Sequence, residues 1–162
     1  MAMRRPTVNP LWAPWRMDYI LGEKDQGCMF CRALAAGPAR FRELLVLCAL
    51  PHAFVMMNKF PYNNGHIMVV PVRHSADPMA LTLAENQALA ELLRQSTAAV
   101  GRVLAAHGSN VGMNLGESAG AGVCAGAGAG AQTSSTGVLS MPSTPRKSIS
   151  PIATRISRNL VC

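Results

Sequence analysis

Residues 58–74 read NKFPYNNGHIMVVPVRH, and this stretch decides the fold. Its first half has the composition of a loop, because Pro61 and Gly65 are residues that favour turns. The run from His66 to Val70 is apolar and ends at Pro71, a pattern that predicts a buried strand. The stretch therefore predicts a loop that leads directly into a strand of a sheet.

Two shorter apolar runs precede this stretch. Residues 44–48 and 53–57 are separated by Pro51 and His52, and this spacing predicts a β-hairpin. Together with the strand at 66–70, the hairpin predicts an antiparallel meander.

A long helix is predicted after the meander. The pattern Thr82-Leu83-Ala84-Glu85 is a capping box, which marks the start of a helix, and Gly108 is a plausible stop. The apolar residues between them fall largely on one face: Leu89, Leu92, Leu93, Val100, Val103 and Leu104. With a further strand at 110–115, the expected fold class is α+β: one antiparallel sheet with one long helix packed on it.

Length and composition limit the chain to one catalytic or binding domain. It has 162 residues, of which 49% are hydrophobic and 14% charged. Polar residues or prolines interrupt every apolar run before it reaches the ~18 residues that span a membrane. Because residues 1–10 also make a poor secretory signal, we expect a cytoplasmic protein.

The net charge of +7 is unevenly distributed. Residues 1–117 contain all the acidic residues and carry +3, whereas residues 118–162 contain four basic residues and no acid. All aromatic residues lie between Trp12 and Tyr62, so the basic tail has no aromatic platform for single strands. A solvated basic tail is expected, and a specific nucleic-acid module is not.

The character of the sequence changes near residue 123. Residues 125–131 alternate Ala and Gly, and the rest is rich in Ser, Thr and Pro. We expect an N-terminal arm at 1–22, a folded domain at 23–123, and a largely disordered, low-complexity tail at 124–162. Within that tail, residues 138–141 or 148–153 offer short candidates for a strand.

Two cysteines have the spacing of half a zinc site. Cys28 and Cys31 form a Cys-x-x-Cys pair, which needs about two further ligands for tetrahedral closure. Two reduced thiols in a turn are the alternative, and a thioredoxin-like redox role has less support because no βαβ pattern surrounds the pair. His66 and His74 are roughly 25 Å apart along an extended chain, so they would not share one metal unless the strand bends.

The glycines between 112 and 130 raise the question of a phosphate loop. Backbone N–H groups in glycine-rich turns bind anions. The spacing matches neither the P-loop nor the Rossmann fingerprint, and a flexible turn explains these glycines equally well.

Taken in order, these segments resemble the histidine triad (HIT) superfamily, in particular its branch of diadenosine tetraphosphate phosphorylases and hydrolases. The resemblance is carried by Leu11–Arg16, Cys28–Cys31, residues 58–74, Gly112–Gly116 and Gly120–Gly122. It implies an antiparallel sheet with a long helix, a homodimer, and a nucleotide or dinucleoside polyphosphate bound at the sheet. Family members cleave their substrates through a covalent nucleotidyl-histidine.

The resemblance also assigns roles to individual residues. Phe30 and Asn58 would contact base and ribose, and many relatives have Asp at the position of Asn58. His66 would lie behind these contacts. The residues implied near the phosphates are Asn114, Gly116, Gly120 and Gly122.

The zinc-binding members of the family imply a metal site as well. In them Cys28, Cys31 and His74 would be three zinc ligands, and a histidine of the last strand would be the fourth.

The sequence departs from the family at its catalytic motif. The defining His-x-His-x-His should follow Gly120–Gly122 on a further strand, but Val123 and Cys124 are followed by the Ala-Gly repeat. No two histidines in the chain are two residues apart. We therefore expect an inactive relative of the dinucleoside polyphosphate enzymes, in which the last strand is lost or replaced. The alternatives are a non-catalytic nucleotide-binding remnant and a truncated or frameshifted product.

Overall fold

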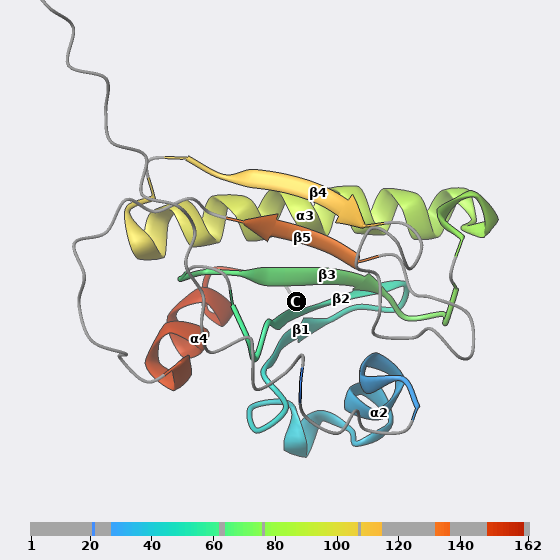
Figure 1. Cartoon of the computed structure of the whole chain (residues 1–162), viewed down its shortest axis with the longest axis horizontal. Helices are drawn as coiled ribbons and strands as arrows, with labels where there is room; N and C mark the ends of the chain where they lie inside the picture. The colour runs from blue at the N-terminus through green and yellow to red at the C-terminus, as the bar shows by residue number, and fades with distance from the viewer. Residues whose placement is uncertain are drawn as a thin grey trace, which may run out of the picture.

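The computed structural model of the chain describes one α+β domain (Figure 1). The described residues are 21, 27–61, 64–75, 77–106, 108–114, 132–136 and 149–160. The arm expected at 1–22, except residue 21, and the glycines at 116, 120 and 122 lie outside them.

An antiparallel sheet forms the centre of the domain. Its strands are β1 (Val46–Ala49), β2 (Ala53–Met57), β3 (Ile67–Pro71), β4 (Asn110–Asn114) and β5 (Gln132–Thr136). They lie in the order β1-β2-β3-β5-β4, and every neighbouring pair is antiparallel. The meander predicted from the apolar runs is confirmed, and so is the strand predicted from residue 110.

Strands β2 and β3 are apolar on both faces, because both faces of the sheet are covered there. Successive side chains of a strand point to opposite sides. Val55 and Val69 therefore pack with the long helix α3, whereas Phe54 and Met68 pack in a second cluster with the short helix α2. The sheet separates two apolar layers.

The long helix α3 (Leu83–Leu104) begins where the sequence predicts it. Thr82 Oγ1 accepts a hydrogen bond from Glu85 N, and Glu85 Oε2 accepts one from Thr82 N, so the capping box is confirmed. The helix ends three residues earlier than a stop at Gly108 requires, because Ala105 takes a left-handed conformation with φ 50°. Its buried side, including Leu92 and Val100, covers β2 and β3.

Short elements connect these strands and helices. Helix α2 (Met29–Ala35) precedes a 3-10 turn, η2 (Pro38–Arg40), and a second 3-10 turn, η3 (Pro78–Ala80), leads from β3 into α3. None of the described helices has the length and apolarity needed to cross a membrane.

The described part of residues 124–162 is more ordered than the sequence suggests. Strand β5 pairs with both β3 and β4, so of the two expectations for the last strand, loss or replacement, the structure shows replacement. Residues 149–157 form helix α4 (Ile149–Ser157), not the strand considered at 148–153, and residues 138–141 lie outside the described residues. Helix α4 packs against α3 and β1, with Ile156 fully buried and Leu160 8% exposed. A disordered tail is therefore wrong for these residues.

Candidate functional site

Cys28 and Cys31 lie on one side of helix α2. Cys28 is the N-cap residue and Cys31 is in the first turn, and residues three apart on a helix are neighbours on its surface. Phe30, between them, points into the apolar layer and is 3% exposed. The two cysteines therefore lie at the start of a helix that the buried Phe30 holds in place, and not in an isolated turn.

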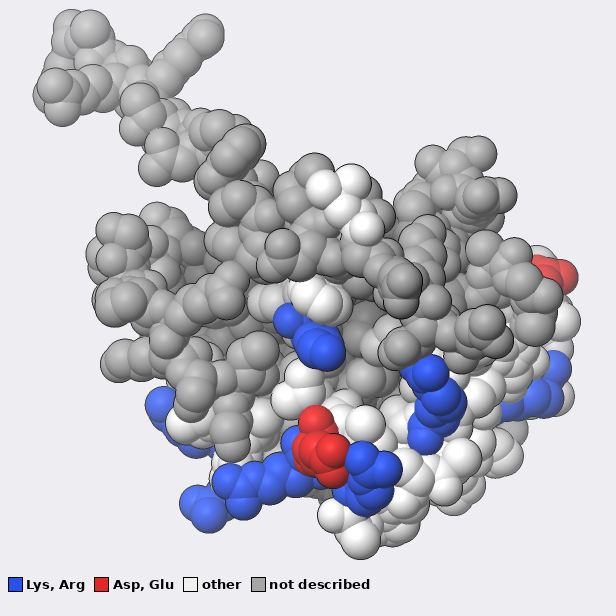
Figure 2. Space-filling model, turned by 60° about the horizontal axis from the view of Figure 1, so that its bottom comes forward, with Lys and Arg blue, Asp and Glu red and all other residues white. Residues whose placement is uncertain are grey.

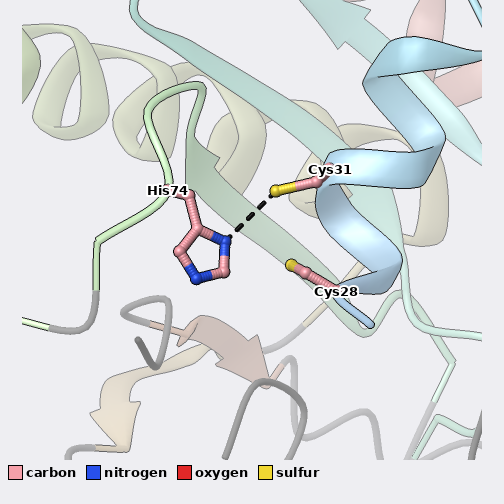
Figure 3. A group of neighbouring side chains, drawn as sticks. All are labelled: Cys28, Cys31 and His74. Atoms are coloured by element: carbon pink, nitrogen blue, oxygen red, sulfur yellow. Dashed lines mark hydrogen bonds between the residues drawn. The ribbon is translucent and has the colours of Figure 1, made fainter. Parts of the chain in front are cut away.

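His74 comes to the two cysteines from the segment that follows β3 (Figure 3). Its Nδ1 lies 3.1 Å from Cys31 Sγ, and the candidate ligand atoms of the three residues lie within 4.8 Å of one another. Four ligands around zinc, with bonds of about 2.0–2.3 Å, are themselves roughly 3.3–3.8 Å apart. The three side chains therefore fit a shared metal ion after small rotations.

A recess lies between these three residues and the apolar layer. It has a volume of about 10 Å³ and is lined by Phe30, Phe54 and Val70 together with the cysteines and His74. That volume corresponds to a single water-sized particle. The recess is therefore large enough for a single ion.

The electrostatics of the thiols suit a metal better than a reactive nucleophile. Desolvation, followed by the hydrogen bond and charge of Cys28, raises the pKa of the Cys31 thiol above its usual value of 9.0. A raised pKa lowers the thiolate fraction at neutral pH, whereas a bound metal displaces the proton. Cys48, which is buried in β1, lies outside this group.

Two of the residues expected to bind a nucleotide lie together at the end of the β2–β3 ladder that is away from the cysteines. Asn58 N donates a 3.0 Å hydrogen bond to His66 O, and Asn58 Oδ1 accepts one of 2.8 Å from Phe60 N. Asn58 is half-buried and His66 is 3% exposed. The structure thus brings these two residues together.

Phe30 and Asn114 are placed differently. Phe30 packs edge-to-face on Phe54, with ring centroids 6.4 Å apart, and belongs to the core cluster beneath α2. Asn114 ends β4 opposite Gln132. A role in nucleotide binding remains a prediction for both residues, as it does for the three glycines outside the described residues.

The three candidate metal ligands, Cys28, Cys31 and His74, lie near one end of the β2–β3 ladder, and the Asn58–His66 pair lies at the other. Met57 faces Ile67 next to Asn58, whereas Ala53 faces Pro71 next to the segment of His74. These two pairings are four residues apart, or roughly 14 Å along a strand. The three candidate metal ligands therefore lie near the end of the ladder that is away from Asn58.

The charged residues that the structure describes give no second candidate site on the face that Figure 2 shows. On the face that Figure 2 shows, the Lys and Arg side chains lie in separate groups and not in one continuous patch. Arg40, for example, is 2.8 Å from Glu43, which offsets its charge.

One polar contact near the site was not anticipated from the sequence. Arg73, next to His74, forms a bidentate ion pair with Glu85 of α3, at 2.7 and 2.8 Å. Glu85 was recognised only as part of the capping box. A pattern along the chain identifies such a cap, but it does not indicate which arginine packs against it.

Comparison with known proteins points to one family. The profile of the HIT domain matches residues 43–124, which contain β1 to β4 and α3. An AP-4-A phosphorylase of Mycobacterium tuberculosis is 33% identical over 125 residues, a match that covers 72% of this chain. The chain covers 63% of the length of that relative.

Solved structures share the fold at low sequence identity. A Hit-like protein from Bartonella henselae superposes with a TM-score of 0.66 at 15% identity, over 85% of this chain and 100% of that one. A zinc-bound histidine triad family protein from Mycobacterium smegmatis gives 0.60 at 17% identity, over 82% and 91%. A histidine triad nucleotide-binding protein from Sulfolobus tokodaii gives 0.65 at 16% identity, over the same shares.

Proposed function

Because this chain belongs to the HIT domain family, we propose that it binds a nucleotide or dinucleoside polyphosphate without cleaving it through a nucleotidyl-histidine. The family match across β1 to β4 and α3 supports nucleotide binding. The AP-4-A phosphorylase relative favours diadenosine tetraphosphate as the ligand. The sequence supports the absence of cleavage, because no two of its histidines stand two residues apart. Nucleophilic catalysis of this kind requires a side chain that forms the covalent intermediate.

Asn58 is the residue on which binding is best tested. Its Oδ1 already accepts the hydrogen bond of Phe60 N, so its amide NH₂ group is the part available to a ligand. In Asn58→Asp the carboxylate keeps one acceptor for Phe60 N and offers the other to ribose hydroxyl groups. We expect Asn58→Asp to bind AMP more tightly than the parent chain, and Asn58→Ala to bind it more weakly.

The test combines calorimetry with product analysis on the full chain. AMP and diadenosine tetraphosphate are titrated separately, and products are followed by chromatography in the same samples. Asn86→Ala is the matched control, because Asn86 caps α3 through Leu81 O and Thr82 O, away from the β2–β3 loop. A 2′,3′-dideoxy analogue of AMP then isolates the contribution of the ribose.

Each outcome has a definite meaning. Binding without product supports the proposal. Product formation would show that the non-catalytic half is wrong and that another residue supplies the nucleophile. A folded chain that binds neither compound would favour the alternative of a truncated or frameshifted product.

We further propose that Cys28, Cys31 and His74 bind zinc. The support is the approach of their ligand atoms to within 4.8 Å, and the zinc-bound relative from Mycobacterium smegmatis. Zinc would act here as a structural cross-link between α2 and the segment after β3.

Zinc binding is tested by metal content and by substitution with Co²⁺. We expect one equivalent of zinc in the purified protein and loss of it in Cys28→Ser and His74→Asn. His52→Asn is the matched control, because His52 is exposed and lies outside the group of potential ligands. Zinc retained in His74→Asn but lost in His52→Asn would contradict the assignment.

A homodimer and a cytoplasmic location are also proposals. Val111 and Met113 support the dimer, because they are 46% and 39% exposed on β4, at the edge of the sheet. Light scattering during size-exclusion chromatography tests the dimer, and Val111→Lys is expected to shift the mass toward the monomer.

A further inference from the structure

His74 is presented by a short segment that leaves the sheet at the end of β3. Residues 72–74 are exposed, and the imidazole reaches Cys31 on α2 from this exposed segment. A metal ligand on an exposed segment loses conformational freedom when the metal binds. The affinity of the site therefore depends on how well the segment is held in place beforehand.

Arg73 ties this segment to helix α3. Its Nε and Nη2 donate hydrogen bonds of 2.7 and 2.8 Å to the two carboxylate oxygens of Glu85, and Nη2 also donates one of 2.7 Å to Ala80 O. The Glu85 side chain is only 8% exposed, and Oε2 is further fixed by Thr82 N at 2.7 Å. A bidentate pair to an immobile carboxylate defines the orientation of the arginine, not merely its distance.

Neighbouring side chains of this segment reach opposite layers of the molecule. Arg73 contacts α3, which covers one face of the sheet, and His74 contacts α2, which covers the other. Arg73 and His74 are adjacent in the chain, so the position of one side chain limits where the other can reach. Holding Arg73 on α3 therefore limits the positions open to His74, which Figure 3 shows pointing toward Cys31 of α2.

Two further hydrogen bonds hold the flanks of the segment. Val72 N donates a 3.0 Å hydrogen bond to His52 O, and Ser75 Oγ donates one of 3.0 Å to Asp77 O. Among the hydrogen bonds recorded for the described residues, those of Arg73 are the ones that join residues 72–75 to α3.

We propose that Arg73 and Glu85 form a positioning pair that preorganises His74 for metal binding with Cys28 and Cys31. The inference rests on the proposed zinc site. Neither residue ligates the metal. The pair acts through His74, so its loss weakens metal binding without removing a ligand.

The experiment compares metal affinities of the full-length chain and its variants. Glu85→Gln removes the carboxylate but keeps a residue type that functions in a capping box. Arg73→Lys keeps the charge and loses the bidentate geometry. Glu91→Gln is the matched control, because Glu91 makes the same kind of pair with Arg94 on α3, at an exposed position without contact to this segment.

Zn²⁺ affinity is measured by competition with a chromophoric chelator, and coordination by the visible spectrum of bound Co²⁺. We expect Glu85→Gln to weaken Zn²⁺ binding at least tenfold, as the loss of supporting residues around metal ligands commonly does. Arg73→Lys is expected to fall between Glu85→Gln and the parent chain, and Glu91→Gln to match the parent. The Co²⁺ bands of Glu85→Gln should lose intensity as water replaces the imidazole.

A double variant separates positioning from general stability. If Glu85 acts through His74, Glu85→Gln has no further effect on Zn²⁺ affinity once His74→Asn is present. Equal losses in both backgrounds would overturn the inference, and so would an unchanged affinity in Glu85→Gln. A parent chain that binds no Zn²⁺ would instead refute the proposed zinc site itself.

Discussion

Replacing Gly65 by alanine tests how closely the β2–β3 loop packs on helix α3. Gly65 lies directly before His66 with φ +78°, a left-handed conformation that costs a residue with a side chain about 1–2 kcal/mol. An added Cβ would lie 2.5 Å from Leu104 Cδ1 and 3.0 Å from Val100 Cγ1. Both neighbours are buried, at 8% and 2% exposure, so they have little room to move.

The backbone strain at residue 65 and the clash of the added Cβ both lower the free energy of unfolding. Overpacking a close-packed core costs about 1–3 kcal/mol, and the stiffer unfolded chain of an alanine variant returns about 0.4–1 kcal/mol. We expect Gly65→Ala to lower the free energy of unfolding by about 2–4 kcal/mol. That is a large part of the ~5–15 kcal/mol that stabilises a typical domain.

Urea unfolding followed by circular dichroism measures this loss. With an m-value of about 2 kcal/mol/M, the midpoint should fall by roughly 1–2 M while the slope stays the same. Gly101→Ala is the control, because no atom lies within 4 Å of its added Cβ and it sits inside α3. That variant should gain about 0.5–1 kcal/mol.

A second background separates the clash from the backbone strain. Leu104→Val removes the Cδ1 atom, so in that background Gly65→Ala should cost less, approaching the ~1–2 kcal/mol of the left-handed conformation, while the contact with Val100 Cγ1 remains. If Gly65→Ala changes stability by less than 0.5 kcal/mol, a threshold of about the usual effect of a surface substitution, the close approach to α3 is refuted.

Three further predictions concern helix α3. Ala105→Gly should raise the free energy of unfolding by about 1 kcal/mol in the same urea assay, because Ala105 has φ 50°; a loss would refute the cap. Thr82→Ala should lower it by about 1 kcal/mol by removing the acceptor for Glu85 N, and an unchanged midpoint would contradict this role. The ion pair with Arg73, followed by Thr82 N, lowers the pKa of Glu85 from 4.5 to about 2. The stability from this shift is therefore complete above pH 4.5 and lost as the pH falls toward 2, and Glu85→Gln should flatten that part of an acid-unfolding curve.

The sequence predicts the strands and the long helix because their signals are local. Apolar runs bounded by proline and glycine place β2 and β3 to within one residue, and the capping box at Thr82 places the start of α3. Boundaries fail where the backbone takes a conformation that its residue does not favour. Leu45 has φ 61°, and β1 accordingly begins at Val46 instead of residue 44.

Two helices escaped prediction for different reasons. Helix α2 has no acidic residue in its first turn and no side-chain hydrogen bond at its cap, so it lacks the usual signals of a helix start. Helix α4 does carry a signal, because Ile152, Ile156 and Leu160 are spaced four residues apart. The Ser- and Pro-rich composition around it concealed that pattern.

The candidate site was predictable in its residues but not in its geometry. Cys-x-x-Cys spacing and the family resemblance identify Cys28, Cys31 and His74, and the structure confirms that the three come together. The Arg73–Glu85 pair joins residues twelve apart in sequence across a turn. No periodicity encodes such a contact, because it depends on how the segment after β3 folds back on α3.

Strand β5 explains how the fold can persist where the family's catalytic motif does not. A strand is held in a sheet mainly by backbone hydrogen bonds, which any residue except proline can supply. The sequence Gln-Thr-Ser-Ser-Thr at 132–136 therefore pairs with β3 and β4 although it contains no histidine. Nucleophilic attack, in contrast, requires a particular side chain at a particular register. A replacement strand can thus complete the sheet and leave Asn58, His66 and the three candidate metal ligands in place. Completing the sheet and supplying a nucleophile are separate requirements, and the described residues of this chain complete the sheet.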